Sequence, residues 1–130
     1  MGINWLAAVV AGLAGFGVGA VWYSVLFAKE WAKLMPFDPR SPGGYPVPVA
    51  MGGAALLSVI AAIIFAIFLG PNPSFGFAVG AGLAAGIGWI GTSIFTNGLF
   101  QRQPVELMLI NTGNHVVQFV VFGLILGLWH

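Results

Sequence analysis

The sequence predicts an all-α integral membrane protein, a four-helix bundle whose helices are connected by short loops. Composition is the first observation: 59% of the 130 residues are hydrophobic and 5% are charged, whereas a soluble domain is about 25% charged. Second, the mean hydropathy is +1.00, and the apolar residues form four stretches that are each long enough to cross a bilayer as a helix. Third, no stretch alternates with a period of two, so a membrane barrel is not indicated.

Composition also excludes several classes of function. The chain has no cysteine, which excludes disulfides, thiolate metal sites and cysteine nucleophiles. The net charge is +1 and there is no run rich in Lys or Arg, so we expect no nucleic-acid partner. We interpret residues 1–130 as a single transmembrane domain that has the lipid bilayer as its main surroundings.

The first predicted span covers residues 3–27. Val18, Gly19 and Ala20 loosely resemble the cleavage site of a secretory signal. However, no Lys or Arg precedes the apolar run, and the run is longer than the roughly 7 to 15 residues of a signal's apolar region. We therefore expect this span to remain in the mature protein.

A polar segment, residues 28–48, follows and is predicted to be a loop. Its second half is rich in residues that disfavour helices, namely Pro36, Pro39, Pro42, Gly43, Gly44, Pro46 and Pro48. The second span is predicted at 49–69, with Pro48 in the first turn of its helix. Bulky residues fill the outer half of this span and indicate exposure to lipid or to a broad partner surface: Ile60, Ile63, Ile64, Phe65, Ile67 and Phe68.

The third and fourth spans are predicted at 75–99 and 105–129. Ser74 follows two prolines and suits an N-cap, whereas Asn97 and Gly98 resemble a helix C-terminus. Pro104 is predicted to start the fourth helix. Glu106 would then lie in its first turn, where a carboxylate meets the positive end of the helix dipole; the alternative role is a proton or cation acceptor.

The basic residues predict the orientation. Lys29, Lys33 and Arg40 lie in segment 28–48 and Arg102 lies in segment 100–104, and four crossings place these two loops on the same side. By the positive-inside rule both loops are cytoplasmic and both termini are outside.

Three segments resemble a known family. They are Asn4-Trp5-Leu6-Ala7, then Trp22-Tyr23-Ser24 with Leu26-Phe27 and Trp31, and finally Gly123-Leu124-Ile125-Leu126-Gly127-Leu128-Trp129. Together they resemble the small bacterial membrane proteins grouped as domain of unknown function 1761. Val25 and Ala28 stand where members commonly have the helix breakers Pro and Gly. The resemblance implies four spans, a bacterial cytoplasmic (inner) membrane and no assigned activity, so it transfers no catalytic or binding residue.

Small residues recur at four-residue spacing in two spans. The rows are Ala7, Ala11, Gly15 and Gly19 in the first span, and Gly80, Ala84, Gly88 and Ala78, Gly82, Gly86 in the third. Such rows let helix backbones approach closely in lipid. We therefore expect one dominant internal contact, between the first span and the third; an interface with another subunit is the alternative.

One face of the fourth span is polar. Asn111, Asn114, His115 and Gln118 fall within an arc of about 100° on a helix, and burying such groups without partners is costly. Thr92 and Thr96 of the third span lie at a similar depth, and Tyr23 and Ser24 of the first could approach them. These eight residues form a candidate polar pocket that opens towards the cytoplasm.

The polar cluster has two interpretations. In one, the amides and the imidazole hydrogen-bond neighbouring helices and fix their register. In the other, they hold a small polar solute, a lipid headgroup or a relayed proton, with His115 titrating. A metal or haem is not expected, because His130 belongs to the opposite surface and no second strong ligand accompanies His115.

We expect no catalytic residue and no cofactor, since Ser24, Ser58 and Ser93 lack a recognisable base and orienting acid. The function that the sequence favours is a non-enzymatic structural or accessory subunit, which packs against other membrane proteins or its own copies. The alternative is a small transporter or ligand-binding membrane module that uses the polar pocket of the fourth span.

Overall fold

The structure is a computed structural model that describes residues 2–35 and 44–130, and in these ranges it contains helices and no strand. In chain order the elements are α1 (Trp5–Val21), η1 (Trp22–Leu26), α2 (Ala28–Leu34), α3 (Val47–Leu69), α4 (Phe75–Ala85), η2 (Gly86–Gly91), α5 (Thr92–Gln101) and α6 (Val105–Leu128). Here η1 and η2 are π-helical segments that continue the helices before them. Four helical units, Trp5–Leu26, Val47–Leu69, Phe75–Gln101 and Val105–Leu128, are long and apolar enough to cross a membrane. The all-α four-helix prediction is therefore confirmed.

Several helix starts follow the rules used to predict them. Ser74 caps α4 by accepting a hydrogen bond from the backbone N–H of Phe77 at 3.2 Å, as predicted. Pro48 lies in the first turn of α3 and Glu106 in the first turn of α6, also as predicted. Asn4 caps α1 in the same way as Ser74, through the N–H of Ala7 at 3.0 Å.

Two helix ends differ from the prediction. Segment 28–48 is not entirely a loop. The first helical unit is interrupted at Phe27, and the residues after it form the short helix α2. The third span does not end at Asn97 and Gly98 but continues to Gln101, and Arg102 takes the left-handed conformation that ends it. Gly98 is instead a packing residue, since a Cβ there would collide with the side chain of Met108. Of the predicted loop residues, Pro36, Pro39, Arg40, Pro42 and Gly43 lie outside the described residues.

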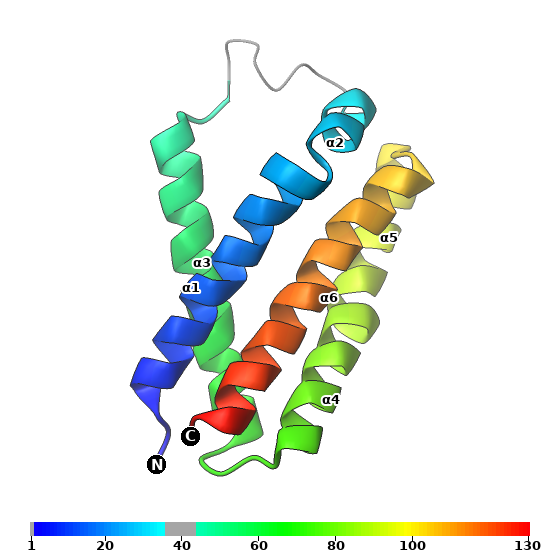
Figure 1. The fold of residues 1–130 in the computed structure, drawn as a ribbon. Coiled ribbons are helices and arrows are strands. Elements are labelled where there is room, and N and C mark those ends of the chain that lie inside the picture. Colours follow the sequence, from blue (N-terminus) through cyan, green and yellow to red (C-terminus); the bar gives the residue numbers. More distant parts are fainter. Residues whose placement is uncertain (1, 36–43) are drawn as a thin grey trace.

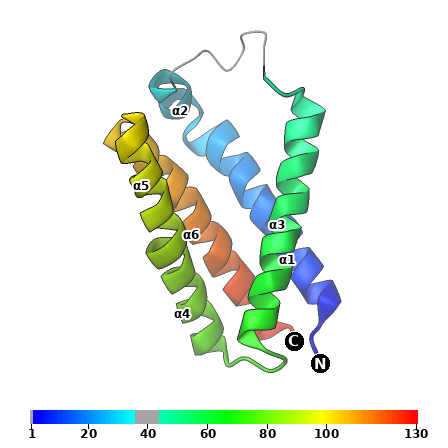
Figure 2. The ribbon, with the colours of Figure 1, turned by 180° about the vertical axis from the view of Figure 1, so that it is seen from behind.

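The four long helical units have a simple arrangement, in which α1 packs against α3 on one side and α6 on the other, and α4 packs against α6. Figures 1 and 2 show α1 and α4 on either side of α6. The predicted contact between the first and third spans is therefore wrong. Their small residues serve two separate interfaces: Gly12 of α1 meets the backbone of Val59 in α3, and Gly82 meets the backbone of Phe119 in α6.

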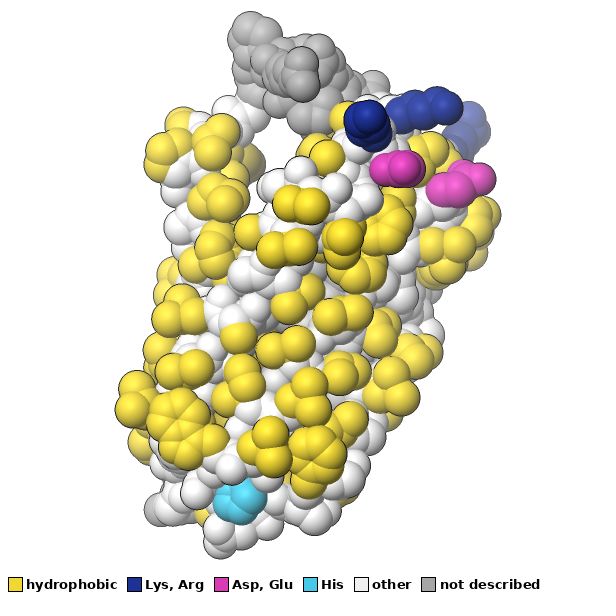
Figure 3. Space-filling model, in the orientation of Figure 1, with side chains coloured by type: hydrophobic (Ala, Val, Ile, Leu, Met, Phe, Trp, Pro, Cys, Tyr) yellow, Lys and Arg dark blue, Asp and Glu magenta, His cyan; other side chains and the backbone are white. Residues whose placement is uncertain are grey.

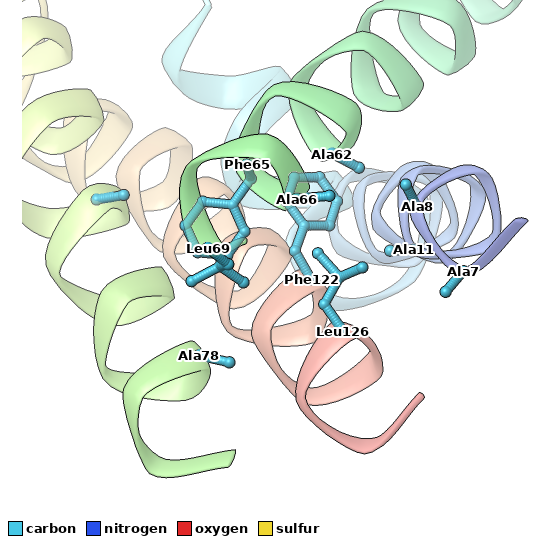
Figure 4. Close-up of a cluster of buried hydrophobic side chains, with 11 residues drawn as sticks. Ala7, Ala8, Ala11, Ala62, Phe65, Ala66, Leu69, Ala78, Phe122 and Leu126 are labelled. Atoms are coloured by element: carbon cyan, nitrogen blue, oxygen red, sulfur yellow. The ribbon is translucent and has the colours of Figure 1, made fainter. Parts of the chain in front are cut away.

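The apolar core lies towards the end of the fold that carries the termini (Figures 1 and 4). Phe65 of α3 and Phe122 of α6 fill the space between their helices, with ring centroids 6.4 Å apart. Ala7, Ala8 and Ala11 of α1 belong to the same buried apolar cluster. Phe65 was predicted to face outwards but is 5% exposed, whereas its neighbours Ile64 and Phe68 are 62% and 57% exposed.

The two ends of the molecule differ in charge. Both termini lie at one end, and Figure 3 shows acidic and basic side chains gathered at the other, above a largely hydrophobic surface. The described charged residues there are Lys29, Glu30, Lys33, Arg102 and Glu106. We call this the charged end.

Candidate functional site

A cavity of about 570 Å³ lies between α1, η1, α3, η2 and α6. Most of its wall is apolar, with Phe16, Leu57, Ile90 and Phe119 among the lining residues. Six polar side chains also line it: Tyr23, Ser24, Ser58, Asn114, His115 and Gln118. This volume and this mixture are typical of sites for small organic molecules, which range from about 300 to 1,000 Å³.

A chain of hydrogen bonds crosses the deep part of the cavity. The Ser58 hydroxyl donates to the backbone carbonyl of Gly12 at 2.7 Å, which links α3 to α1. Gln118 donates from Nε2 to the Oγ of Ser58 at 2.9 Å, which links α6 to α3. At the other end of its amide, Gln118 Oε1 lies 2.8 Å from Nδ1 of His115. Three of the four long units are thus connected.

This chain determines how His115 is protonated when neutral. The single Ser58 proton goes to Gly12, so Gln118 must present Nε2 to Ser58 and Oε1 to His115. An amide oxygen only accepts, and His115 must therefore carry its hydrogen on Nδ1. The other ring nitrogen, Nε2, then has a lone pair and acts as an acceptor.

Asn114 adjoins this chain and is incompletely paired. Its side chain is 8% exposed and lines the cavity, yet Oδ1 finds no hydrogen-bond partner among the described residues. A buried acceptor without a partner costs about 1–3 kcal/mol. Gly19 faces it, with 3.6 Å between Oδ1 and the position a Cβ would take. Such a group calls for an explanation, which can be a bound water, an ion or a functional role.

Two side chains fix η1 against α6. The Tyr23 hydroxyl donates to Oδ1 of Asn111 at 2.6 Å, and Nε1 of Trp22 donates to the carbonyl oxygen of Ile110 at 2.9 Å. Gly113 leaves room for the indole, since a Cβ there would lie 2.7 Å from Cζ2 of Trp22. Tyr23 is therefore held at the cavity wall, and its hydroxyl oxygen can still accept a hydrogen bond.

Both π-helical segments border the cavity. Tyr23 and Ser24 come from η1 and Ile90 comes from η2. Such segments interrupt the regular hydrogen-bond pattern of an α-helix and occur often at functional sites. In η2 the carbonyls of Gly88 and Trp89 accept hydrogen bonds from the hydroxyls of Thr92 and Ser93 at 2.7–3.0 Å.

The predicted pocket residues separate into two groups. Tyr23, Ser24, Asn114, His115 and Gln118 line one cavity, and Asn111 reaches it through Tyr23. Thr92 and Thr96 do not belong to it, because both are exposed and bond carbonyls four residues earlier in their own helical unit.

Sequence reasoning missed the part that Ser58 plays. It considered Ser58 only as a nucleophile, whereas the structure makes it the acceptor that joins Gln118 to α3. A signal was present, since Ser58 is the one polar residue of segment 49–69.

The predicted packing residues also separate. Ala11 and Gly15 are buried in α1, and Gly15 and Gly19 line the cavity. Gly82 and Gly86 meet the backbone of α6 at Phe119 and Val116. Gly80 and Gly88 do not pack within the fold: both are exposed, and a Cβ at either would meet nothing described within 4 Å.

A family model for proteins of unknown function, DUF1761, matches residues 6–127 of the chain. The match covers nearly all of the sequence and includes every residue that lines the cavity. The chain belongs to the DUF1761 family. It matches no curated protein and no solved structure.

The chemistry open to this DUF1761 protein follows from the residues around its cavity. No Asp, Glu, Lys or Arg is among the described residues that line it, and the described residues hold no group of three or more His, Cys, Asp or Glu that could bind a metal. Ser58 gives its proton to a backbone carbonyl instead of to a base. The arrangement is suited to binding an uncharged group through hydrogen bonds.

Proposed function

We propose that this DUF1761 protein is a non-enzymatic ligand-binding module of the membrane, which holds a small molecule in the cavity between α1, α3, η2 and α6. One observation carries the proposal: Asn114 lines the cavity, and its Oδ1 is buried and lacks a partner in the described part of the chain. A bound hydrogen-bond donor would supply that partner and remove the cost of leaving the acceptor unpaired.

The competing interpretation is that the polar cluster only fixes helix register. It accounts for Gln118, Ser58 and His115, which bond one another and Gly12. It does not account for Asn114, which lines the cavity and whose Oδ1 has no hydrogen-bond partner among the described residues. A purely structural cluster would gain stability from an apolar residue at that position.

The proposal is tested by identifying what the protein retains. The wild type, Asn114→Leu and the control Thr96→Val are extracted into nanodiscs with their native lipids, and native mass spectrometry then measures bound small molecules. Thr96 is a matched control because it is exposed and bonds its own helix. We expect one retained species in the wild type and in Thr96→Val, and its loss in Asn114→Leu. Equal spectra for all three proteins would contradict the proposal.

A second candidate function, an accessory subunit that contacts other membrane proteins or its own copies, is favoured by the outer face of the third unit. Gly76, Gly80, Ala84 and Gly88 recur at four-residue spacing and are all exposed. A Cβ at any of the three glycines would meet nothing described within 4 Å. Exposed rows of this kind are typical of close contacts between helices in lipid.

The accessory function is tested by blocking that row. Gly80→Leu should remove stoichiometric partners or self-association after gentle detergent extraction, as measured by light scattering and protein mass spectrometry. The control is Gly52→Leu on α3, a position that is also exposed and free of described neighbours. A wild type that is monomeric and alone after gentle extraction would refute this function.

A further inference from the structure

We infer that the ligand of this cavity is an uncharged, hydroxyl-bearing amphiphile, a molecule with a long apolar body and one hydrogen-bond donor, and that it reaches the cavity sideways from the bilayer between α3 and η2. This inference rests on the proposed binding function and specifies the chemical class of the ligand.

The first step is an apolar extension of the cavity. A second cavity of about 340 Å³ follows the same face of α3 towards the termini. It shares Ala61, Ile90 and Phe119 with the polar cavity, so the two adjoin. The lining residues of α3 run from Met51 to Phe68, a rise of about 25 Å at 1.5 Å per residue. The combined groove is long and narrow, as an alkyl or isoprenoid chain requires.

The second step is the route of access. Leu57 lines the polar cavity and Trp89 lines the apolar one, yet these side chains are 66% and 68% exposed. Both lie within membrane-spanning units, so their exposed surface faces lipid. In Figure 2, α3 lies apart from α5 at the charged end. α3 packs mainly on α1 and touches α6 little, so the groove opens sideways to the bilayer.

The third step is the polar part of the ligand. Asn114 and Tyr23 both line the cavity; Oδ1 of Asn114 is buried and lacks a described partner, and the hydroxyl oxygen of Tyr23 gives its own hydrogen to Asn111. His115 adds Nε2, an acceptor in the tautomer that Gln118 imposes. Acceptors of this kind pair with a donor, and a hydroxyl is the smallest neutral group that supplies one.

The fourth step excludes a charged head. The described lining contains no carboxylate and no Lys or Arg to neutralise a ligand charge, and an unpaired ion inside a bilayer costs several kcal/mol. Asn114 also lies deep, nine residues after Val105 in α6, which is about 14 Å along the helix. The zwitterionic head of a phospholipid would have to leave the interface to reach it, whereas a single hydroxyl has little hydration to lose.

The experiment uses photoreactive probes in phosphatidylcholine nanodiscs. The full-length protein receives hexadecanol with a diazirine in its chain, or the same chain ending in a methyl ether, a carboxylate or a trimethylammonium group. Labelling is counted as saturable when an excess of unmodified hexadecanol prevents it. The labelled peptides are located by mass spectrometry. We expect saturable labelling by the alcohol on α3 and η2, and roughly tenfold less by the ether, as the loss of about 1.4 kcal/mol from one hydrogen bond predicts.

Two variants connect the labelling to the site. Asn114→Leu should lower saturable labelling by the alcohol to the level of the ether, and Thr96→Val should leave it unchanged. Without the probe, Asn114→Leu should unfold at a higher temperature than the wild type, because leucine removes the unpaired buried acceptor. A variant that failed to fold would instead lose both labelling and thermal stability, and His115→Leu would then replace it in the labelling comparison.

The outcomes separate the inference from the proposed function. Stronger saturable labelling by the carboxylate or the ammonium probe would overturn the inference and leave a ligand-binding module. The absence of saturable labelling, together with a retained species of other chemistry in native mass spectrometry, would do the same. Equal labelling by all four probes, unaffected by Asn114→Leu, would show ordinary lipid contact and overturn both.

Discussion

Nε2 of Gln118 lies 2.9 Å from Oγ of Ser58 and joins α6 to α3, two helices whose backbones come close at few points. On the side of this bond nearer the charged end, the polar cavity lies between the two helices. On the side nearer the termini, aromatic side chains of the core fill the space between them. The bond therefore sets the separation of the two helices at the depth where a ligand would bind.

The Ser58–Gln118 bond should appear as an energetic coupling. Ser58→Ala leaves a buried amide donor unpaired, and Gln118→Leu removes that donor together with the acceptor of His115. Hydrogen bonds between helices in lipid contribute on average about 0.6 and at most about 1.7 kcal/mol. We expect each single variant to lower the free energy of unfolding in mixed micelles, and the double variant to lose less than the sum.

The control for this coupling is another serine. Ser93 is exposed and donates to the carbonyl of Trp89 in its own helical unit, so Ser93→Ala and Gln118→Leu should have additive effects. Additivity for Ser58 as well would show that the bond does not link the helices in solution.

Two glycines of α4, one helical half-turn apart, should respond oppositely to an added methyl group. Gly82 faces α6, and its Cβ would collide with the carbonyl oxygen of Phe119; Gly80 faces outwards and meets nothing described. Gly82→Ala should lower the free energy of unfolding by about 1–3 kcal/mol, the usual cost of overpacking. Gly80→Ala should leave it unchanged or slightly higher, because alanine favours a helix over glycine. Equal losses would mean that α4 packs on a different face.

The helices were predictable because their signals are local. The apolar stretches, Ser74, Pro48 and Glu106 each depend on the residues beside them, and the structure has them as predicted. Which helices pack against each other was not predictable. A row of small residues indicates that the backbone of another helix comes close, but it does not indicate which helix. Gly12 and Gly82 both pack tightly, yet against different helices.

The candidate site was predictable from the fourth span and less so from the third. Periodicity placed Asn114, His115 and Gln118 on one face of α6, and all three line the cavity. Thr92 and Thr96 also lie four residues apart, but the π-helical segment before them changes the phase of the helix, and their hydroxyls bond backbone carbonyls four residues earlier. A uniform helical period cannot foresee such a change.

The indole of Trp22 should depend on the absence of a side chain at residue 113. A Cβ there would lie 2.7 Å from Cζ2 of Trp22, so Gly113→Ala must displace the ring and weaken its 2.9 Å bond to the carbonyl of Ile110. The indole N–H resonance of Trp22 should move towards that of an unbonded indole, and the free energy of unfolding should fall by about 1–3 kcal/mol. Gly17→Ala is the control, since that glycine meets nothing described. An unmoved resonance in Gly113→Ala would contradict the contact.

The topology predicts that residues 33 and 130 are accessible from opposite sides of the membrane. Lys33 lies in α2 at the charged end and His130 at the end with both termini (Figure 1), and by the positive-inside rule we expect the charged end to be cytoplasmic. Because the chain has no cysteine, Lys33→Cys and His130→Cys each give a single thiol. In intact cells an impermeant maleimide should label position 130 and should reach position 33 only after the membrane is opened. Ile64→Cys, at an exposed position of α3 that we expect to face lipid, should resist labelling under both conditions. Labelling of 33 and 130 from the same side would exclude the three crossings expected between them, and with these the depth assigned to Asn114. Labelling of 33 alone in intact cells would reverse the orientation and leave that depth unchanged.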